Sequence, residues 1–365
     1  MSSLAKSLCI YKYEKYLKHV EVHESGAILI GKYFEVDGYA GRPIRVVTHA
    51  HADHLYGIEE SIRNAKFIVA TPITIDLIEV LGYVKQELNY YMKIKSQPLD
   101  YYKQLKVEDH VCTLLPADHI PGAAQVLVEI SSENLRIGYT GDFKLTSRTE
   151  IIANPSVLVI ESTYGNPMYI RTHKDAAPQV LVDLVVEGLQ KYKRVYIYAY
   201  HGKMQEAMEI LRSSGVEAPF VLPAKVYYAT QLLERKYGLK VGEYFKEGNA
   251  IPSKGVVVFK HFDSARSRKI DGSALHIVLT GRLISEPYKK VDDYTYVVSL
   301  SDHADFSELV TYVEKSSPEL VVVDGSRSNN AEALVDYLLS KGFCAIALPA
   351  STRDNLQAPE HMATR

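Results

Sequence analysis

The sequence predicts an α/β protein with two domains, or one domain with a large insertion. Its 365 residues exceed the usual size of a single domain. The first half reads as short apolar strands separated by turns, whereas strands and helices alternate from about residue 176 onward. Such alternation is typical of a parallel sheet covered by helices. We therefore expect a strand-rich part combined with a separate α/β part.

The expected strands of the first half are short, apolar and bounded by turn residues. They cover residues 27–30, 33–36, 44–47, 66–70, 110–115, 124–130, 135–139 and 157–160. Thr71 as an N-cap, followed by Pro72 in the first turn, predicts a helix after the fourth of these strands. Residues 84–108 are polar and rich in Lys and Tyr, so we expect an exposed, irregular segment there.

The second half alternates between the two kinds of element. Helices are expected around residues 180–189, 203–211, up to 233 and from 305 onward, and strands at 195–199, 220–222, 256–259, 277–280, 296–300, 320–323 and 345–348. Gly215 and Gly238 end two of the helices.

The most informative stretch is Thr48-His49-Ala50-His51-Ala52-Asp53-His54, directly after a buried strand. On an extended chain His49, His51 and Asp53 share one face, because side chains alternate with period two. A turn after Asp53 would divide these groups and His54 between two adjacent metal ions. Imidazole together with carboxylate suits zinc or a similar first-row metal better than calcium or magnesium. The alternative is a His-rich surface turn, which the position after a buried strand disfavours.

Two later loops carry single side chains of the same kind. Asp118-His119-Ile120-Pro121-Gly122 and Thr140-Gly141-Asp142-Phe143 each follow an apolar strand. Alone, a histidine or aspartate in a loop is usually structural or solvated.

Together these motifs resemble the metallo-β-lactamase superfamily, with His119 and Asp142 similar to its third histidine and bridging aspartate. The resemblance implies an αββα sandwich with a metal site at the sheet edges. It assigns His49, His51 and His119 to one metal ion, Asp53 and His54 to a second, and Asp142 to both. Two zinc ions per chain are expected, with a weak second site and manganese left open.

Later motifs resemble the β-CASP branch of that superfamily, which inserts an α/β cap into the sandwich. Ile160-Glu161-Ser162-Thr163-Tyr164-Gly165 and Ser301-Asp302-His303-Ala304-Asp305-Phe306 resemble the motifs that flank the insertion. The sandwich would then comprise residues 1–175 and 295–350, the cap 176–294, and a frayed tail 351–365.

The branch consists largely of nucleases, so the resemblance implies hydrolysis of phosphodiester bonds in single-stranded DNA or RNA. His303 would donate a proton to the leaving oxygen, oriented by Glu161, and Asp53 completes the catalytic set as a ligand of the second metal. The alternatives are a solvated carboxylate at Glu161 and an idle ring at His303.

A third motif of the branch carries histidine in RNA-directed members and valine in many DNA-directed ones. The aligned residue here is Asp324, which would either ligate the second metal or only shape the turn before Gly325. The missing histidine, and a likeness around 161–171 to exonucleases found with DNA ligases, favour a DNA exonuclease over an RNA-processing ribonuclease. Polarity and endo or exo mode stay open.

Phosphate contacts are expected from the cap. Gly202 and Lys203 open a helix, whose N–H groups and positive dipole end attract anions, and Arg282 lies in a later cap motif. His201, without a partner in sequence, is expected to be structural or at the surface.

Composition limits the setting and the partners. Lys and Arg number 42 against 44 Asp and Glu, so an anionic substrate must meet a local basic patch. No apolar run approaches a membrane span or a signal peptide. The three cysteines, Cys9, Cys112 and Cys344, suggest no disulfide framework and fit a reducing, cytoplasmic setting.

Two other functions fit part of the sequence. A thioesterase or lactonase would use the same metal motif, but needs neither a cap nor Glu161 and His303. A non-catalytic nucleic-acid-binding subunit would tolerate loss of the metal ligands, which are intact here. β-CASP proteins often dimerise, so a homodimer is compatible with the resemblance.

Overall fold

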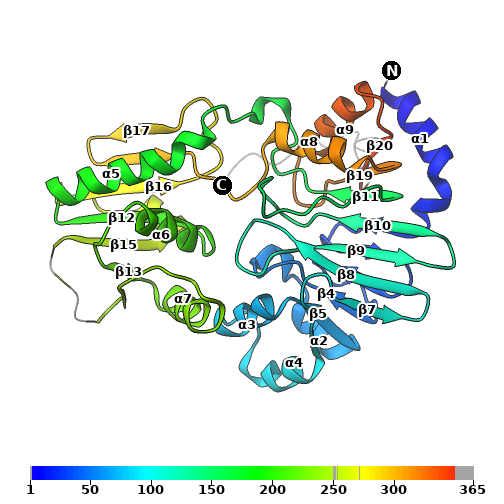
Figure 1. Cartoon of the computed structure of the whole chain (residues 1–365), viewed down its shortest axis with the longest axis horizontal. Helices are drawn as coiled ribbons and strands as arrows, with labels where there is room; N and C mark the ends of the chain where they lie inside the picture. Colours follow the sequence, from blue (N-terminus) through cyan, green and yellow to red (C-terminus); the bar gives the residue numbers. More distant parts are fainter. Residues whose placement is uncertain (1, 250–251, 253, 271, 350–365) are drawn as a thin grey trace, which may run out of the picture.

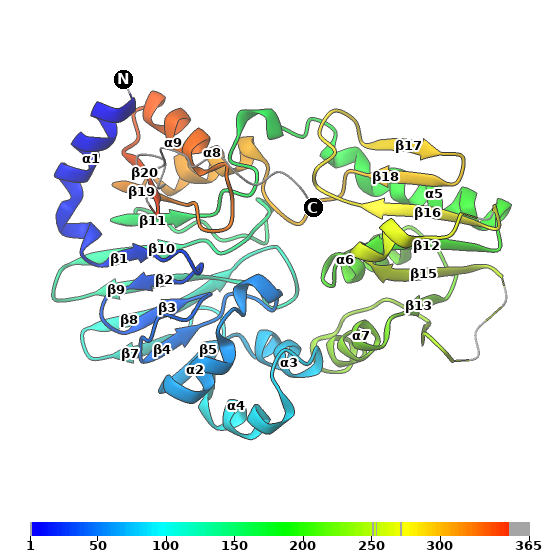
Figure 2. The ribbon, with the colours of Figure 1, turned by 180° about the vertical axis from the view of Figure 1, so that it is seen from behind.

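The computed structural model describes residues 2–249, 252, 254–270 and 272–349, so the expected tail at 351–365 lies outside it. Two bodies lie side by side, a sandwich of sheets and a smaller cap (Figure 1). Figure 2 shows the same arrangement from behind. Within the described residues, no helix is both long and apolar enough to cross a membrane.

The first sheet of the sandwich comes from the N-terminal part of the chain. Its strands lie in sequence order and are β1 (Val20–Val22), β2 (Ile28–Ile30), β3 (Phe34–Val36), β4 (Ile44–Val46), β5 (Phe67–Ala70) and β6 (Ser96–Pro98). Strands β3 to β6 are parallel, so their carboxyl ends share one edge of the sheet.

The second sheet has the order β20-β19-β11-β10-β9-β8-β7. These strands are β7 (Gln104–Val107), β8 (His110–Pro116), β9 (Ala124–Ile130), β10 (Leu135–Tyr139), β11 (Val157–Ile160), β19 (Leu320–Asp324) and β20 (Ala345–Leu348). Strands β8, β10, β11 and β19 run in the same direction, because β9 pairs antiparallel with both β8 and β10.

Strand β11 shows why the sandwich has four layers. Its residues alternate between the two faces, and all four are buried. Val157 and Val159 pack between the sheets, whereas Leu158 and Ile160 pack under helices. The covering helices are α8 (Phe306–Ser316) and α9 (Ala331–Ser340) on the second sheet, and α2 (Ile58–Asn64) and α3 (Pro72–Val80) on the first. This is the predicted αββα sandwich.

The cap is the predicted parallel α/β layer. Its sheet has the order β14-β13-β15-β12-β16-β18-β17, with only the edge strand β17 antiparallel among the described residues. The strands are β12 (Arg194–Ala199), β13 (Phe220–Leu222), β14 (Tyr244–Lys246), β15 (Val256–His261), β16 (Ala274–Leu279), β17 (Tyr288–Asp292) and β18 (Thr295–Val298). Helices α5 (Ala177–Lys191) and α6 (Lys203–Ser213) cover one face, and α7 (Ala224–Tyr237) lies beside α3 (Figures 1 and 2). Because β18 pairs with β16, the sandwich resumes after residue 298 and not at 295.

The expectation of an irregular segment at 84–108 was wrong. The segment contains α4 (Asn89–Lys95) and the edge strands β6 and β7. Leu88, Met92 and Leu99 are buried and anchor it to the sandwich. Its polar composition reflects the exposed face of α4, which hid these few buried positions.

The expectation of no disulfide was also wrong. Cys9 lies on the N-terminal helix α1 (Ser2–Leu17) and forms a disulfide with Cys344, with 5.4 Å between the Cα atoms. Cys112 is free and buried. The two bonded cysteines are 335 residues apart, so only the packing of α1 beside β20 brings them together. Cysteine usage therefore no longer supports a reducing compartment.

Candidate metal centre

The predicted ligands gather at one edge of the sandwich because each follows the carboxyl end of a strand. His49 and His51 follow β4, His119 follows β8, and Asp142 follows β10. A short 3-10 turn at Ala52–His54 directs the buried ring of His54 inward. The chain therefore turns already at Ala52, and not after Asp53 as expected from the heptad, so Asp53 lies within the turn.

Each of four histidines uses one ring nitrogen as an outward hydrogen-bond donor. His49 Nδ1 lies 2.9 Å from Thr48 Oγ1, whose own proton goes to Asp37. His119 Nδ1 donates to the Asp302 carbonyl (2.7 Å), and His51 Nε2 donates to the His201 carbonyl (3.3 Å). His54 Nδ1 donates to Asp37 Oδ2 (2.8 Å). A neutral imidazole has one donor and one acceptor nitrogen, so in His49, His51 and His119, whose pKa values are lowered, the remaining nitrogens carry lone pairs.

Three of these lone pairs face one another. His51 Nδ1 lies 3.1 Å from His49 Nε2 and 3.1 Å from His119 Nε2. Because their protons point outward, these nitrogens cannot hydrogen-bond to each other, and their lone pairs repel. Only a bound cation, or an added proton, would stabilise them at this distance. Tetrahedral zinc with bonds of 2.0–2.1 Å places its ligand nitrogens about 3.3 Å apart. The three histidines therefore fit one zinc ion.

The protonation of these rings suits the same role. Burial, together with the neighbouring imidazoles, holds the pKa of His49 well below its usual range. Burial and the His119 ring lower the pKa of His51 to about 4, and burial and His303 lower that of His119 to about 4. All three rings are neutral near pH 7, the form that binds metals.

His54 and Asp142 form a second, charged part of the centre. Asp142 Oδ2 lies 3.1 Å from His54 Nε2 and 3.7 Å from His49 Nε2. His54 Nε2 is nevertheless buried without a hydrogen bond of acceptable geometry. Burial opposes charge on both groups, but their attraction outweighs it. It raises the pKa of His54 to about 10 and holds the pKa of Asp142 well below its usual range. Release of the His54 Nε2 proton on metal binding would leave a lone pair and a carboxylate oxygen at this distance, which fit two ligands of a shared cation.

Asp53 and Asp324 lie outside the groups of described residues whose ligand atoms are all within 4.8 Å of one another. The side chain of Asp53 is 64% exposed, and its Oδ2 lies 3.5 Å from His54 Nε2. Both oxygens of Asp324 are already bonded, Oδ1 to Ser326 N (2.8 Å) and Oδ2 to Arg327 (3.2 Å). Of the two roles open for Asp324, this geometry favours shaping the turn.

His303 and Glu161 lie beside the cluster. His303 Nδ1 is 3.1 Å from Glu161 Oε2, and the other Glu161 oxygen accepts from Phe143 N (3.0 Å). His303 Nε2 lies 4.0 Å from Asp142 Oδ2. Burial disfavours the charged ring, but Glu161 and Asp142 outweigh it and raise the pKa of His303 to about 10. The ring therefore holds a proton near pH 7 and faces the cluster.

The three expected phosphate contacts differ in their surroundings. The Gly202 N–H donates to Gln205 Oε1 (2.7 Å), and the buried Lys203 Nζ pairs with Asp302 (2.8 Å). Both are occupied within the protein, whereas Arg282 is exposed. A cavity of about 500 Å³ opens next to the cluster, between the sandwich and the cap, and includes His303, Lys144, Lys174, Arg171 and Glu206 in its lining.

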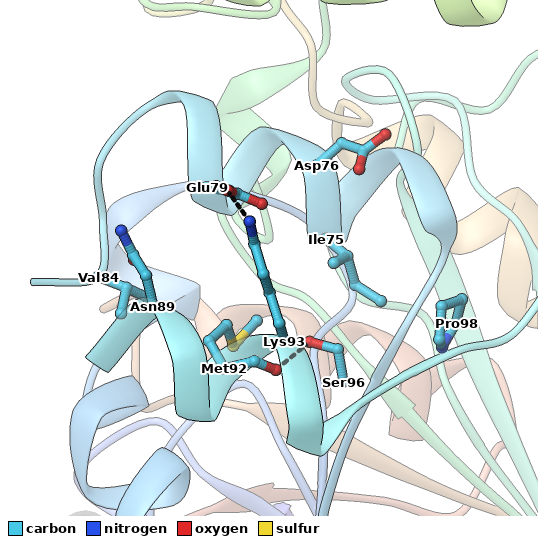
Figure 3. Close-up of a pocket in the computed structure, with 9 residues that line it drawn as sticks. All are labelled: Ile75, Asp76, Glu79, Val84, Asn89, Met92, Lys93, Ser96 and Pro98. Atoms are coloured by element: carbon cyan, nitrogen blue, oxygen red, sulfur yellow. Dashed lines mark hydrogen bonds and ion pairs between the residues drawn. The ribbon is translucent and has the colours of Figure 1, made fainter. Parts of the chain in front are cut away.

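A second cavity of about 340 Å³ lies between α3 and α4 (Figure 3). Lys93 on α4 reaches across it to Glu79 on α3 (2.9 Å). Its lining residues include none of the predicted metal ligands.

Sequence reasoning missed two residues of the centre. Asp37 orients His54 and Thr48, and it follows β3, the parallel neighbour of β4. A carboxylate at the carboxyl end of a neighbouring strand was a usable signal. His201, expected to be structural or at the surface, instead packs edge-on against the His51 ring with 4.8 Å between the centroids. No local pattern links it to His51, 150 residues earlier.

Comparison with known proteins agrees with this architecture. A family model described as the beta-lactamase superfamily domain matches residues 40–222. A solved structure, a protein of unknown function from Enterococcus faecalis, superposes with a TM-score of 0.56 at 16% identity, covering 84% of this chain and 79% of its own.

Three curated relatives are similar in sequence. A protein of Acidianus ambivalens, described as uncharacterized and located in the lig 3′ region, is 41% identical over 39% of this chain and 99% of its own length. A probable DNA ligase of Opitutus terrae is 28% identical over 76% of this chain, which spans only 26% of that ligase. A probable RNase of Methanocaldococcus jannaschii is 24% identical over 82% of this chain and 85% of its own.

The family match covers the strand edge that carries His49 to Asp142 and extends into the first two strands of the cap, β12 and β13. The chain belongs to the metallo-β-lactamase superfamily and, within it, to the β-CASP branch.

Proposed function

We propose that this protein is a metal-dependent nuclease that hydrolyses phosphodiester bonds in single-stranded nucleic acid. The observation that carries the proposal is the position of His303. Its ring is held by Glu161 on one side and faces Asp142 and the histidine cluster on the other. The alkoxide that leaves a phosphodiester needs such a proton carrier, whereas the thiolate that leaves a thioester does not.

In this proposal His49, His51 and His119 hold one zinc ion. His54 and Asp53 hold a second, and Asp142 lies between the two sets with Oδ2 at 3.1 Å from His54 and 3.9 Å from His119. Bound zinc would supply Lewis acidity and an activated water for attack on phosphorus. Asp324 is assigned to the turn before Gly325, so the second site has fewer protein ligands than the first.

The protein's own residues supply the proton chemistry. Glu161 accepts the Nδ1 proton of His303, which fixes the ring and leaves Nε2 directed at the cluster. His303 then protonates the leaving oxygen from Nε2. The same position would also allow His303 to bind metal with His119 and Asp142, so the metal content of a His303 variant distinguishes the two roles.

DNA is the proposed polymer and exonuclease the proposed mode. A relative located in the lig 3′ region and a match to a probable DNA ligase support DNA, whereas the match to a probable RNase supports RNA as the second candidate. The ion-paired cations around the cavity leave few free charges for a duplex, which favours a single strand. Lys144 pairs with Glu206, and Lys174 pairs with Asp305 and Glu308.

The test uses zinc-reconstituted protein with matched single-stranded DNA and RNA, labelled at either end. We expect stepwise shortening of DNA from one end, with slower or no cleavage of RNA. The Glu161→Gln variant serves as a control that keeps the side chain shape and weakens the hold on His303. Preferred cleavage of RNA would reverse the choice of polymer. Hydrolysis of thioester or lactone substrates, with both polymers intact, would contradict the nuclease proposal.

A further inference from the structure

One short segment of the cap reaches into the metal centre of the sandwich. Residues 201–203, named here the cap turn, comprise the end of the connection from β12 and the first residue of α6. The His201 carbonyl accepts the outward Nε2 proton of His51 (3.3 Å). The only imidazole nitrogen of His51 that can bind zinc is therefore Nδ1, and a cap residue determines this choice.

The ring of His201 is itself held from the sandwich side. Its Nε2 lies 3.1 Å from the hydroxyl of Tyr83, and the ring also hydrogen-bonds the backbone of Ala50, between His49 and His51. The His201 ring packs edge-on against His51. Tyr83 follows α3, so the His201 ring is held both by the heptad, through Ala50, and by a residue after α3.

The cap turn also supports a second metal ligand. Lys203 Nζ pairs with Asp302 Oδ1 at 2.8 Å, and both side chains are buried. The backbone carbonyl of this same Asp302 accepts the outward Nδ1 proton of His119 (2.7 Å). The chain of contacts runs from the cap, through Asp302, to the third histidine of the first site.

Gly202 allows the close approach. It has a φ of +83°, and a Cβ at this position would lie 2.2 Å from Ile120 Cγ2, next to His119. Any other residue would push the cap turn away from the sandwich. Glycine is therefore required here for close packing against Ile120, and not only for the start of α6.

We infer that the cap turn is the outer shell of the first zinc site, with His201 and Lys203 acting as positioning residues for His51 and His119. The inference rests on the metal-binding part of the proposed function. Outer-shell partners fix the orientation of ligating histidines, and their loss typically costs 10–100-fold in metal affinity. Displacement of the cap should therefore loosen zinc, so cap position and zinc retention are coupled.

The chain offers a matched control for this idea. Another contact between cap and sandwich joins α7 to α3, where the Tyr237 hydroxyl and Lys236 both reach Asp76 Oδ2 at 2.5 Å. Figure 3 shows Asp76 on α3, beside the second cavity. Tyr83 and Tyr237 thus both bridge the two bodies through one hydroxyl, but only Tyr83 connects to a metal ligand.

The test measures zinc release to a chromogenic chelator from full-length Tyr83→Phe, Tyr237→Phe, His201→Ala and His201→Gln. We expect Tyr83→Phe to release one zinc about 3–10-fold faster, and His201→Ala about 10-fold faster. His201→Gln retains an acceptor for Tyr83 and should restore most of the retention. Tyr237→Phe should match the wild type. With cobalt in place of zinc, only the His201 and Tyr83 variants should alter the visible spectrum.

Equal zinc release by Tyr83→Phe and Tyr237→Phe, whether slow or fast, would overturn the role of the cap turn and leave the metal site intact. A wild-type protein that takes up no zinc would instead overturn the metal centre itself, and with it the proposed function. Thermal melts of all four variants show whether each is folded. If zinc release is faster only in proportion to a lower Tm in every variant, the inference is also contradicted.

Discussion

The two parts of the metal centre are oriented by different kinds of oxygen. In the first, His49, His51 and His119 donate their outward protons to a hydroxyl and two backbone carbonyls, all uncharged. In the second, His54 donates to the buried carboxylate of Asp37. The first part has three neutral rings, with His51 Nδ1 3.1 Å from one nitrogen of each of the other two, whereas the second has one ring, Asp142 and the exposed Asp53.

This difference suits one part of the centre to tight metal binding and the other to catalysis. In the proposed centre, the three imidazoles would bind the first zinc ion with the direct acceptors of their outward protons all uncharged. The second part has fewer imidazole ligands, and the Asp37 carboxylate offsets this by making His54 a more basic ligand. A site with fewer protein ligands keeps positions for water and substrate, as a catalytic metal requires.

The largest effect is expected from Asp142, which both parts share. Asp142→Ala should abolish nuclease activity and lose at least one zinc per chain, because its Oδ2 lies within 4.0 Å of four histidines. Far-UV circular dichroism should stay near wild type, since the residue lies in a loop after β10. Full activity of this variant without added metal would contradict a shared aspartate.

The next effect separates proton transfer from metal binding. His303→Ala should lower kcat on DNA by roughly 10²–10⁴, as for other general acids, with zinc content unchanged. A p-nitrophenyl phosphodiester, whose leaving group needs no proton, should lose much less. Loss of zinc in this variant would make His303 a third ligand beside His119 and Asp142. An equal loss on both substrates would indicate structural damage.

A smaller effect distinguishes the two parts by zinc release. A chelator should remove the two ions in separate phases, with the ion bound by His54 leaving at least about tenfold faster, because it has fewer imidazole ligands. The assignment of phases is checked with Asp37→Asn, which should speed the fast phase more than the slow one, because Asp37 bonds His54 directly and reaches His49 only through Thr48. A single phase for both ions, in wild type and variant alike, would remove the distinction between the two parts.

The smallest effect concerns the two aspartates outside the close groups. Asp324→Asn should keep both zinc ions and lower the free energy of unfolding by about 1–3 kcal/mol, because it weakens buried bonds to Ser326 and Arg327. Asp53→Asn should do the reverse, with weaker binding of the second zinc and unchanged stability, since its side chain is exposed. Zinc content and urea denaturation are measured for both variants. Loss of zinc in Asp324→Asn would show that Asp324 is a metal ligand.

The sequence was sufficient for the fold class and for most of the residues that the structure gathers at this sheet edge. The heptad was read from its local pattern, whereas His119 and Asp142 were assigned through the resemblance to a known family, because a single histidine or aspartate in a loop carries little information. In the structure each follows a strand that ends at the same edge. The Thr71-Pro72 start of α3 was confirmed in detail, with Thr71 accepting from Thr74 N (3.2 Å). The alternation of strands and helices likewise predicted the cap.

What the sequence did not reveal depends on contacts between distant segments. The Cys9–Cys344 disulfide joins the two ends of the chain, and the His51–His201 contact joins the sandwich to the cap. Lys203 was expected to bind phosphate from its place at a helix start, but Asp302 neutralises it across the same boundary. Local patterns carry no information about which distant carboxylate or carbonyl completes a site.

The central claim, two zinc ions of unequal coordination, is tested most directly by anomalous diffraction at the zinc edge from crystals of the zinc-loaded protein. The account predicts two peaks roughly 3.5–4 Å apart. One should lie among His49, His51 and His119, and a weaker one beside His54 and Asp142. A single peak among the three histidines, with His54 still bonded to Asp37 and no density near its Nε2, would contradict the account.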